Sequence, residues 1–484
     1  MLASVKNLLQ RRHVFAAILT IGWFAMAARN VVDPDVWWHL RTGEYIAAHR
    51  TIPHADPFSY TRAGAPWVAH EWLTDLGLYG IYRSAGWGGL IVVFAAIVAA
   101  SFLVLFLRCS GRRYLAGILT LAGAWATIPV WGVRPQILSL LLTSLWLWIL
   151  ERSKHNRKLL WWTIPIMLLW VNLHAGFALA IVLVALSLIG EFLEHRLGQH
   201  AAATPNLRLR ALMATLVLNL LVVPLNPYGA RMYSYPFETL RSKAMQNYIV
   251  EWASPNFHRL DYLPFLVLLL VTVAVLAWSN TRVRAREMVL LLAATAAALS
   301  AVRMIPFFVL IAVPIISKSL AKKAAPRPQA PARLTFPAVR FLNAGLLLFT
   351  AAFVGIHIAR VIRRQPLSEA EHFPSAAVTF LETHPAPGPI FNHYDWGGYL
   401  IWRLYPQTPV FIDGRADVYG EALHQQFADT YQLKQDWQRT LAHWGIASVI
   451  VPPDSALATG LRRSPGWALS YEDPKAAIFV RLQR

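Results

Sequence analysis

The sequence has a single cysteine, Cys109, and few charged side chains for its length. One cysteine excludes an intramolecular disulfide and a cysteine-based metal cluster. Charged residues make up only 14% of the 484 residues, whereas soluble domains have roughly 25%. Hydrophobic residues make up 56%. A chain this long would otherwise suggest about three soluble domains. The composition excludes that organisation and predicts a polytopic membrane protein.

Several nucleotide-binding and catalytic motifs are also missing. The sequence contains no P-loop, no glycine-rich dinucleotide-binding loop and no nucleophile elbow. Nucleotide-driven chemistry on the cytoplasmic side is therefore not expected. The net charge of +20 would by itself fit a nucleic-acid partner, an anionic lipid surface or a membrane topology. The positions of the basic residues decide between these.

Eleven apolar segments are about long enough to cross a bilayer as helices. They are residues 14–31, 88–107, 115–131, 135–150, 159–173, 177–193, 210–225, 262–279, 287–302, 305–317 and 336–358. The external segments 33–87 and 226–260 are too polar to cross. From about residue 360 the hydropathy falls to that of a soluble domain. We therefore expect a transmembrane domain over residues 1–359 and a separate domain over residues 360–484.

Basic residues are concentrated in alternate loops. If the N-terminus is cytoplasmic, the inside loops hold 22 Lys and Arg residues and four acidic residues, whereas residues 360–484 hold 12 of each. This distribution follows the positive-inside rule. It predicts an integral protein of the cytoplasmic (inner) membrane with a periplasmic C-terminal domain. The charge thus indicates orientation, and no nucleic-acid partner is expected.

The C-terminal region has the pattern of an α/β domain. We expect strands at residues 388–393, 409–412, 447–451 and 476–482, because these are short apolar runs bounded by turn residues. Helices are expected at residues 399–404 and 421–443.

The first external segment carries an acidic motif at a helix start. Asp33 precedes Pro34, which suits a capping residue followed by the first helical position. In the helix that follows, Asp35 and His39 are spaced i, i+4 and share a face. A carboxylate beside an imidazole can hold a divalent metal or accept a proton from a hydroxyl nucleophile.

Other ionisable residues at span ends fall on the same external side, where such groups mark function. Arg134 is equally suited to bind a phosphate or to anchor a helix at the interface. His174, beside Asn172, is equally suited to be a ligand or to pack helices through hydrogen bonds. Asp413 and Arg415 are expected to form a structural salt bridge.

Residues 35–41 (DVWWHLR) resemble the Asp-Pro-Tyr-Tyr-His-x-Arg run in the first external loop of archaeal oligosaccharyltransferase catalytic subunits. An acidic motif directly after the first span is similar to the GT-C superfamily of membrane glycosyltransferases. Residues 64–73 (GAPWVAHEWL) resemble the corresponding segment of the protein mannosyltransferase and aminoarabinose transferase branch, where a second amphipathic helix ends the loop.

Two later elements appear in the order of the same superfamily. Residues 249–255 (IVEWASP) are similar to the Ser-Val-Ser-Glu-x-x-Pro motif of oligosaccharyltransferases, and residues 394–399 (YDWGGY) to the Trp-Trp-Asp-Tyr-Gly region of the same family. Arg303 lies where that family has an arginine near the lipid-linked phosphate. Residues 249–255 have one extra residue before Pro255, and residues 394–399 differ from the family's motif in sequence. The chain is also shorter than the oligosaccharyltransferases. The resemblance therefore implies a reaction class and leaves the acceptor open.

The resemblance implies a polytopic α-helical GT-C-like fold with an external α/β domain. It also implies transfer of a sugar from a polyprenyl-phosphate-linked donor to an unidentified acceptor at the external face. The implied catalytic residues are Asp35, His39, Glu71 and Glu251. The expected substrate-binding residues, from the resemblance and from residue chemistry together, are Arg303, Arg134, His70, His174, Asp395 and Trp396. A divalent ion, Mg²⁺ or Mn²⁺, is expected at Asp35 and Glu251.

Two alternatives remain open. A polysaccharide polymerase or ligase would also act externally, but would depend on arginines. A non-catalytic transporter or assembly protein is the other alternative. A transporter would place ionisable residues near the middle of the bilayer, and the predicted spans are nearly free of charge in their interiors.

Overall fold

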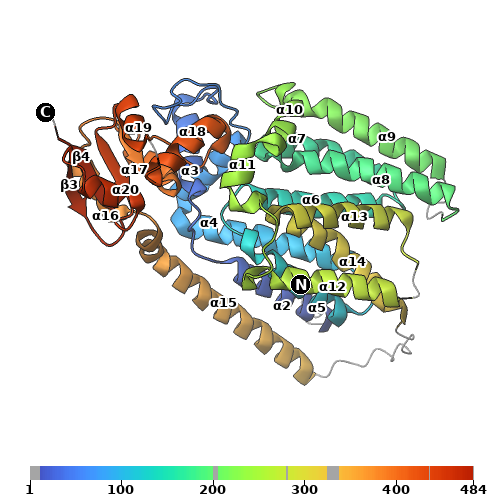
Figure 1. Ribbon diagram of the computed structural model, residues 1–484. Coiled ribbons are helices and arrows are strands. Elements are labelled where there is room, and N and C mark those ends of the chain that lie inside the picture. Colours follow the sequence, from blue (N-terminus) through green and yellow to red (C-terminus); the bar gives the residue numbers. More distant parts are fainter. Residues whose placement is uncertain (1–10, 200–204, 280–281, 324–336, 435, 483–484) are drawn as a thin grey trace. The chain divides into compact units, whose positions relative to one another are not determined.

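The computed structural model describes residues 11–199, 205–279, 282–323, 337–434 and 436–482 (Figure 1). The chain forms two compact units. Unit 1 contains the chain up to Arg29, Ile91–Met232 and Val250–Ile362, and unit 2 contains Asn30–Leu90, Tyr233–Ile249 and the chain from Arg363 onward. Whether residues 1–359 and 360–484 behave as separate domains stays a prediction.

Unit 1 is built from helices. They are α2 (Arg11–Ala27), the later part of α4 (Trp72–Arg108), α5 (Arg113–Thr127), α6 (Gln136–Arg152), α7 (Thr163–Leu173), α8 (Ala178–Arg196), α9 (Pro205–Val222), α12 (Leu263–Trp278), α13 (Ala285–Ser300), α14 (Ile305–Lys323) and the first part of α15 (Pro337–His372). Each predicted apolar segment overlaps one of these helices. The integral-membrane class is therefore supported by the arrangement as well as by the composition.

Among the described residues, six helices are long and apolar enough to cross a membrane. They are Trp72–Arg108, Ala175–Arg196, Asn206–Leu225, Leu260–Trp278, Val302–Ala321 and Val339–His372. In α12, Phe265 and Leu268 are buried while Val267 and Leu270 are exposed. A helix that is apolar on both its buried and its exposed faces is typical of contact with lipid. The expected total of eleven spans stays a prediction.

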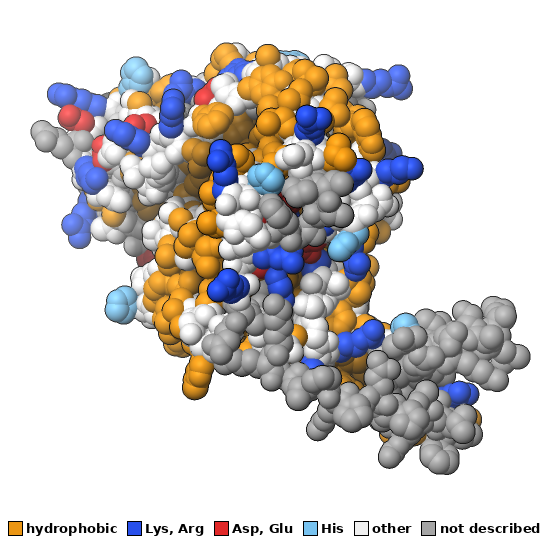
Figure 2. Space-filling model, turned by 90° about the vertical axis from the view of Figure 1, so that its right-hand side faces the viewer, with side chains coloured by type: hydrophobic (Ala, Val, Ile, Leu, Met, Phe, Trp, Pro, Cys, Tyr) orange, Lys and Arg blue, Asp and Glu red, His pale blue; other side chains and the backbone are white. Residues whose placement is uncertain are grey.

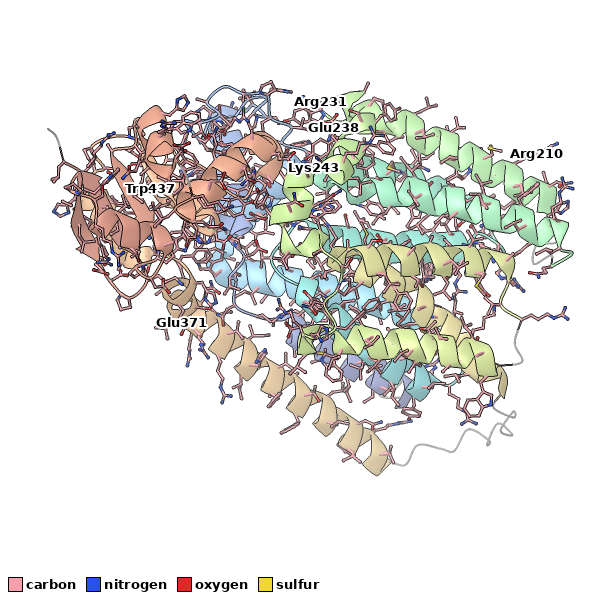
Figure 3. The ribbon with its side chains drawn as sticks, in the orientation of Figure 1. Arg210, Arg231, Glu238, Lys243, Glu371 and Trp437 are labelled. Carbon is pink, nitrogen blue, oxygen red and sulfur yellow. The ribbon has the colours of Figure 1, made fainter. Side chains whose placement is uncertain are left out.

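One end of unit 1 gathers the basic loops that the charge pattern assigns to the cytoplasm. Arg208 of α9 donates to Glu191 at 3.1 Å, to Ser153 Oγ at 2.6 Å and to the Leu150 carbonyl at 3.0 Å. Figure 2 looks onto this end and shows Lys and Arg side chains among hydrophobic ones, and Figure 3 labels Arg210 there. Segments more than 50 residues apart in sequence thus meet at this end, and the orientation in the membrane stays a prediction.

Unit 2 combines short helices with one small sheet. Its helices are α3 (Asp35–His49), the start of α4, α10 (Arg231–Arg241) from Tyr233 on, α11 (Lys243–Tyr248), α16 (Ser375–Thr383), α17 (Gly397–Leu404), α18 (Ala416–Tyr431), α19 (Trp437–His443) and α20 (Ala456–Arg462). A kink at Gly86, where φ is 59°, separates the start of α4 from its apolar remainder. The part of α4 before this kink lies where the resemblance implied a second amphipathic helix.

The described part of the chain has four strands, β1 (Ile390–Asn392), β2 (Ser448–Val451), β3 (Trp467–Glu472) and β4 (Ala477–Arg481). Their order is β1-β2-β4-β3, with β1 parallel to β2 and the other two pairs antiparallel. Every residue of β1 and β2 is buried, so these two strands form the centre of the unit's core. Three of the four strands were predicted, and β3 was not.

Two sequence-based expectations in this unit are wrong. Residues 409–412 do not form a strand of the sheet, and Val410 makes only an isolated bridge to Ser59. The side chain of Asn392 bonds to the Phe411 amide at 2.9 Å and the Ile412 carbonyl at 2.8 Å, so it replaces the expected ladder. The expected helix 421–443 is divided into α18 and α19, because Leu433 and Asp436 both have positive φ angles.

Candidate active site

Asp35 is the first residue of α3. Its amide donates to Asp33 Oδ1 at 2.9 Å, so Asp33 supports the helix start as expected. Asp35 Oδ1 accepts a hydrogen bond from Trp38 Nε1 at 3.1 Å. The same oxygen lies against the backbone of Gly414, where an added Cβ would be only 1.8 Å away. Only glycine leaves room for this carboxylate, so residues far apart in sequence determine its position.

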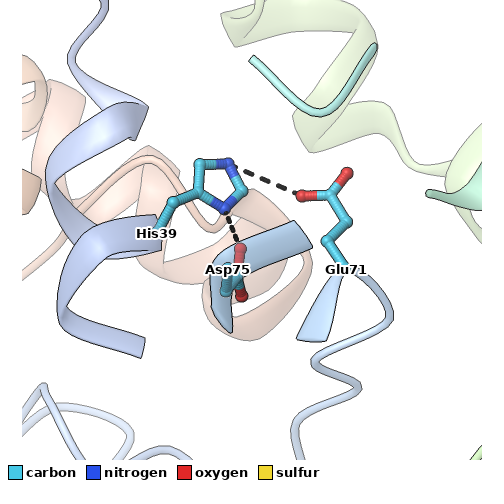
Figure 4. Close-up of side chains that lie close together, drawn as sticks. All are labelled: His39, Glu71 and Asp75. Carbon is cyan, nitrogen blue, oxygen red and sulfur yellow. Dashed lines mark hydrogen bonds and ion pairs between the residues drawn. The ribbon is translucent and has the colours of Figure 1, made fainter. Parts of the chain in front are cut away.

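His39 follows one turn later on α3 and lies between two carboxylates of α4 and the preceding loop (Figure 4). Its Nδ1 is 2.6 Å from Asp75 Oδ1, and its Nε2 is 3.5 Å from Glu71 Oε2. Burial by itself lowers the pKa of His39, but attraction to Asp75, Glu71 and Asp35 outweighs burial and raises it. His39 therefore favours the protonated form between these carboxylates.

The second histidine of this segment extends the buried network. His70 Nε2 is 3.1 Å from Glu71 Oε1, and its ring lies 4.6 Å from the ring of Tyr235 on α10. The Tyr235 hydroxyl donates to Asp417 Oδ2 at 3.1 Å. Burial opposes the charged form of His70, but Glu71 and Asp417 raise its pKa. The second polar segment thus contributes to the network through Tyr235, which the sequence patterns did not single out.

His39, Glu71 and Asp75 are a group that could hold a divalent ion. Each is buried, and one ligand atom from each lies within 4.8 Å of the others. Among the described residues, the buried Asp75 Oδ2 has no hydrogen-bond partner, so this oxygen could bind a cation. An imidazole with two carboxylates is an ordinary ligand set for divalent metals.

This group differs from the ligand pair expected from the sequence. Asp35 belongs to unit 2 and Glu251 to unit 1, so a metal at that pair stays a prediction. Asp75 was not among the residues predicted from the sequence. Its spacing of i, i+4 from Glu71, at the start of a helix, was the available signal.

In a second ionic cluster of unit 2, every charged group is hydrogen-bonded. Arg415 donates to Asp413 through Nε at 2.8 Å and Nη2 at 2.6 Å, and to Asp56 through Nη1 at 2.7 Å. The Tyr419 hydroxyl also donates to Asp413. All these charged groups are buried, and the indole of Trp67 lies 4.7 Å from the guanidinium. The expected structural salt bridge is therefore present, with additional partners.

Three predicted residues of unit 1 lie near one another. Arg134 forms an ion pair with Glu251, and both side chains are partly exposed. The guanidinium of Arg303 lies 4.5 Å from the ring centre of Trp252, the residue after Glu251. The Val302 amide also donates to the Ala253 carbonyl at 3.0 Å. These contacts place two arginines and a carboxylate at one end of the helical unit.

His174 takes part in hydrogen bonds between helices. Its Nδ1 lies 2.7 Å from Ser139 Oγ and 3.0 Å from the Gly176 amide, which donates to it. Ser139 Oγ in turn accepts from Trp170 Nε1 at 2.7 Å. Nδ1 therefore acts as an acceptor in helix packing, which favours that reading over a ligand role.

The last two predicted substrate-binding residues adjoin β1. Trp396 is 3% exposed and packs in the core of unit 2. Asp395, its neighbour, is exposed. Of this pair, only the carboxylate is presented to solvent.

No protein-family model matches the chain, and no curated protein matches its sequence. Solved structures do match, and they show the fold: the chain has the fold of the GT-C glycosyltransferases. The archaeal oligosaccharyltransferase AglB from Archaeoglobus fulgidus, solved with an inhibitory peptide and a dolichol-phosphate, has a TM-score of 0.54 and 12% identity. That match covers 90% of this chain and 69% of AglB.

Two further structures are similar to the chain. The arabinofuranosyltransferase AftD from Mycobacteria has a TM-score of 0.54 and 15% identity, over 97% of this chain and 41% of AftD. ArnT from Cupriavidus metallidurans, crystallised with undecaprenyl phosphate, has a TM-score of 0.49 and 15% identity over 97% of both chains. The matches to AglB and AftD confirm the predicted GT-C fold.

Proposed function

We propose that this protein is a membrane glycosyltransferase that transfers a sugar from a polyprenyl-phosphate-linked donor to an acceptor at the external face of the cytoplasmic membrane. The main support for the proposal is the close contact between the Asp35 carboxylate and Gly414, in a chain with the GT-C fold. A dolichol-phosphate bound to AglB supports a lipid-linked donor for this fold.

Asp35 is the general base of the proposed reaction. An acceptor hydroxyl attacks the anomeric carbon of the donor sugar and gives its proton to the Asp35 carboxylate. The bond between the anomeric carbon and the phosphate oxygen breaks, and polyprenyl phosphate leaves with the electron pair. A positioned base of this kind contributes roughly 10²–10⁴-fold to the rate. Trp38 Nε1 holds the carboxylate in place.

Arg134 and Arg303 are assigned to the donor phosphate. A guanidinium binds phosphate oxygens with two parallel hydrogen bonds and stays charged at any physiological pH. Glu251 orients Arg134 through their ion pair, and Trp252 supports the guanidinium of Arg303. Because these contacts already restrict the two arginine side chains, each side chain loses less conformational entropy when it binds the donor.

His39, Glu71 and Asp75 would hold a divalent ion such as Mg²⁺ or Mn²⁺. When bound, the ion supplies positive charge that stabilises anionic groups. The chain's own contribution is to keep His39 fixed between Asp75 and Glu71, while His70 fixes the second oxygen of Glu71.

The test uses the full-length protein in lipid nanodiscs with undecaprenyl-phosphate-linked hexoses and pentoses as donors and a membrane glycan and lipid extract as acceptor. The readout is release of undecaprenyl phosphate, which every acceptor would produce. We expect Asp35→Asn to lower release by about 100-fold or more. Asp33→Asn is the matched control, because asparagine also supports a helix start. Full release by a folded Asp35→Asn protein would overturn the proposal.

A further inference from the structure

We propose that the acceptor is a carbohydrate and that a group of partly exposed aromatic rings beside Asp35 binds it. This inference rests on the proposed function and names the substrate class of the same site. The group, called the aromatic platform below, consists of Tyr248, His393, Tyr394, Phe427 and Tyr431. All five belong to unit 2.

The rings of the platform form a connected surface along α18. Phe427 and Tyr431, spaced i, i+4 on this helix, stack with their centres 5.6 Å apart and their planes 18° apart. The ring of His393 meets Tyr431 at 5.3 Å, and the ring of Tyr394 lies 6.2 Å from Phe427. Tyr248 joins α11 to this surface, because its hydroxyl donates to Gln425 Oε1 at 2.9 Å.

The exposure of these rings distinguishes them from the core. Phe391, Tyr399, Phe411 and Tyr419 of the same unit are fully buried. Each platform ring keeps an intermediate exposure although burial would stabilise it. Partly exposed aromatic side chains that gather in one place mark binding surfaces, and sugar rings present flat C–H faces that stack on them.

Polar groups among the rings favour a sugar over a lipid chain. The exposed carboxylate of Asp395 adjoins Tyr394 and acts electrostatically on His393 and Tyr431. Sugar hydroxyl groups can donate to this exposed carboxylate, whereas an acyl or isoprenoid chain cannot. A binding site of this composition suits a carbohydrate.

The platform begins next to the proposed catalytic carboxylate. Gly398, four residues after Tyr394, packs so closely on the start of α3 that an added Cβ would be 2.6 Å from the Pro34 carbonyl oxygen. On the other side, Gly414 touches Asp35 and lies two residues before α18. Burial, followed by the nearby Asp35, raises the pKa of Tyr394, which agrees with this proximity. A glycan lying on α18 would therefore extend toward Asp35.

The experiment measures glycan binding by the full-length protein without any donor. Oligosaccharides of mannose, arabinose, galactose and N-acetylglucosamine are tested by saturation-transfer difference NMR in nanodiscs. We expect at least one of them to bind, and Tyr431→Leu and Phe427→Leu to weaken binding by about tenfold. Tyr471→Leu is the matched control, since this partly exposed tyrosine stacks on Phe380 instead.

The inference is overturned if the wild-type protein binds none of these oligosaccharides, or if Tyr431→Leu weakens binding no more than Tyr471→Leu does. Donor cleavage that depends on Asp35, without glycan binding, would refute the carbohydrate acceptor and leave the glycosyltransferase intact. Glycan binding without donor cleavage would support the platform and refute the proposed reaction.

Discussion

Two buried ionic clusters of unit 2 have opposite characters. Around Arg415, every carboxylate oxygen accepts a hydrogen bond: the guanidinium donates to Asp413 and Asp56, and the Ser59 amide donates to the other oxygen of Asp56. Around His39, two carboxylates share one imidazole, and Asp75 Oδ2 has no hydrogen-bond partner among the described residues. Buried charges without complete partners are costly, and proteins retain them mainly where they serve a function. We infer that the first cluster maintains the fold and that the second belongs to the active site.

The largest expected effect tests the first half of this comparison. Arg415→Met leaves Asp413 and Asp56 buried without a countercharge, which should lower the free energy of unfolding by about 3–5 kcal/mol. Chemical unfolding of the purified protein measures the loss. Arg462→Met removes a partner from an exposed ion pair with Glu472 and should cost at most about 1 kcal/mol. Equal losses in the two variants would contradict the structural role of Arg415.

The next effect concerns the position of Asp35. Gly414→Ala introduces a Cβ that collides with Asp35 Oδ1, so the carboxylate must move. A displacement of about 1 Å can cost about 100-fold in rate, which the release of undecaprenyl phosphate would show. Gly466→Ala is the control, because nothing lies within 4 Å of its added Cβ. The assignment of Asp35 fails if Gly414→Ala retains the rate of Gly466→Ala.

A third prediction addresses the incomplete cluster itself. Asp75→Asn should weaken Mn²⁺ binding by about 10–100-fold in calorimetric titrations. Asp429→Asn, which changes an outlying carboxylate paired with Lys434, should not affect it. If the wild-type protein binds neither Mn²⁺ nor Mg²⁺, the group is not a metal site and its carboxylates serve to hold His39.

The pH dependence of the same titration sharpens this prediction. The carboxylates raise the pKa of His39, so its proton persists to higher pH than that of an ordinary histidine. A metal must displace that proton, and its affinity should therefore rise with pH through the raised pKa. Calorimetry between about pH 6 and pH 8.5 measures the trend, since an unperturbed histidine titrates near 6.5. An affinity that is flat over this range would exclude His39 as a ligand.

The smallest effect extends the comparison to two arginines of unit 1. Arg303→Lys keeps the charge but loses the planar fork, and should raise the KM for the donor by roughly tenfold with little change in kcat. Arg208→Lys changes an arginine saturated by Glu191 and Ser153, and should lower stability without changing that KM. A KM that moves with Arg208 and not with Arg303 would reverse the assignment.

The fold could be predicted where local patterns decide it. All eleven apolar segments overlap helices, because a long apolar run in a bilayer leaves the backbone little other choice. The strand expected at residues 409–412 was wrong because a distant side chain, that of Asn392, satisfies its backbone groups. The break between α18 and α19 was missed because Leu433 and Asp436 are not residues that usually end a helix.

The candidate site was predictable to a similar extent. Asp35, His39, His70 and Glu71 stand out as ionisable residues in one external segment, and the structure brings the histidines and Glu71 into direct contact. Tyr235 and Asp417 carried no such signal, since each lies among ordinary neighbours in the sequence. Their pairing arises only when α10 and α18 meet.

The sequence by itself determined the class of protein, the predicted orientation and the residues able to carry charge at the external side. Those properties follow from composition and from spacing along the chain. The tertiary structure alone decided that Asp35 lies on Gly414, that Asp75 completes the group around His39, and that Arg415 bonds to Asp56. Each of these joins residues far apart in sequence, and such contacts depend on how helices pack rather than on local preference.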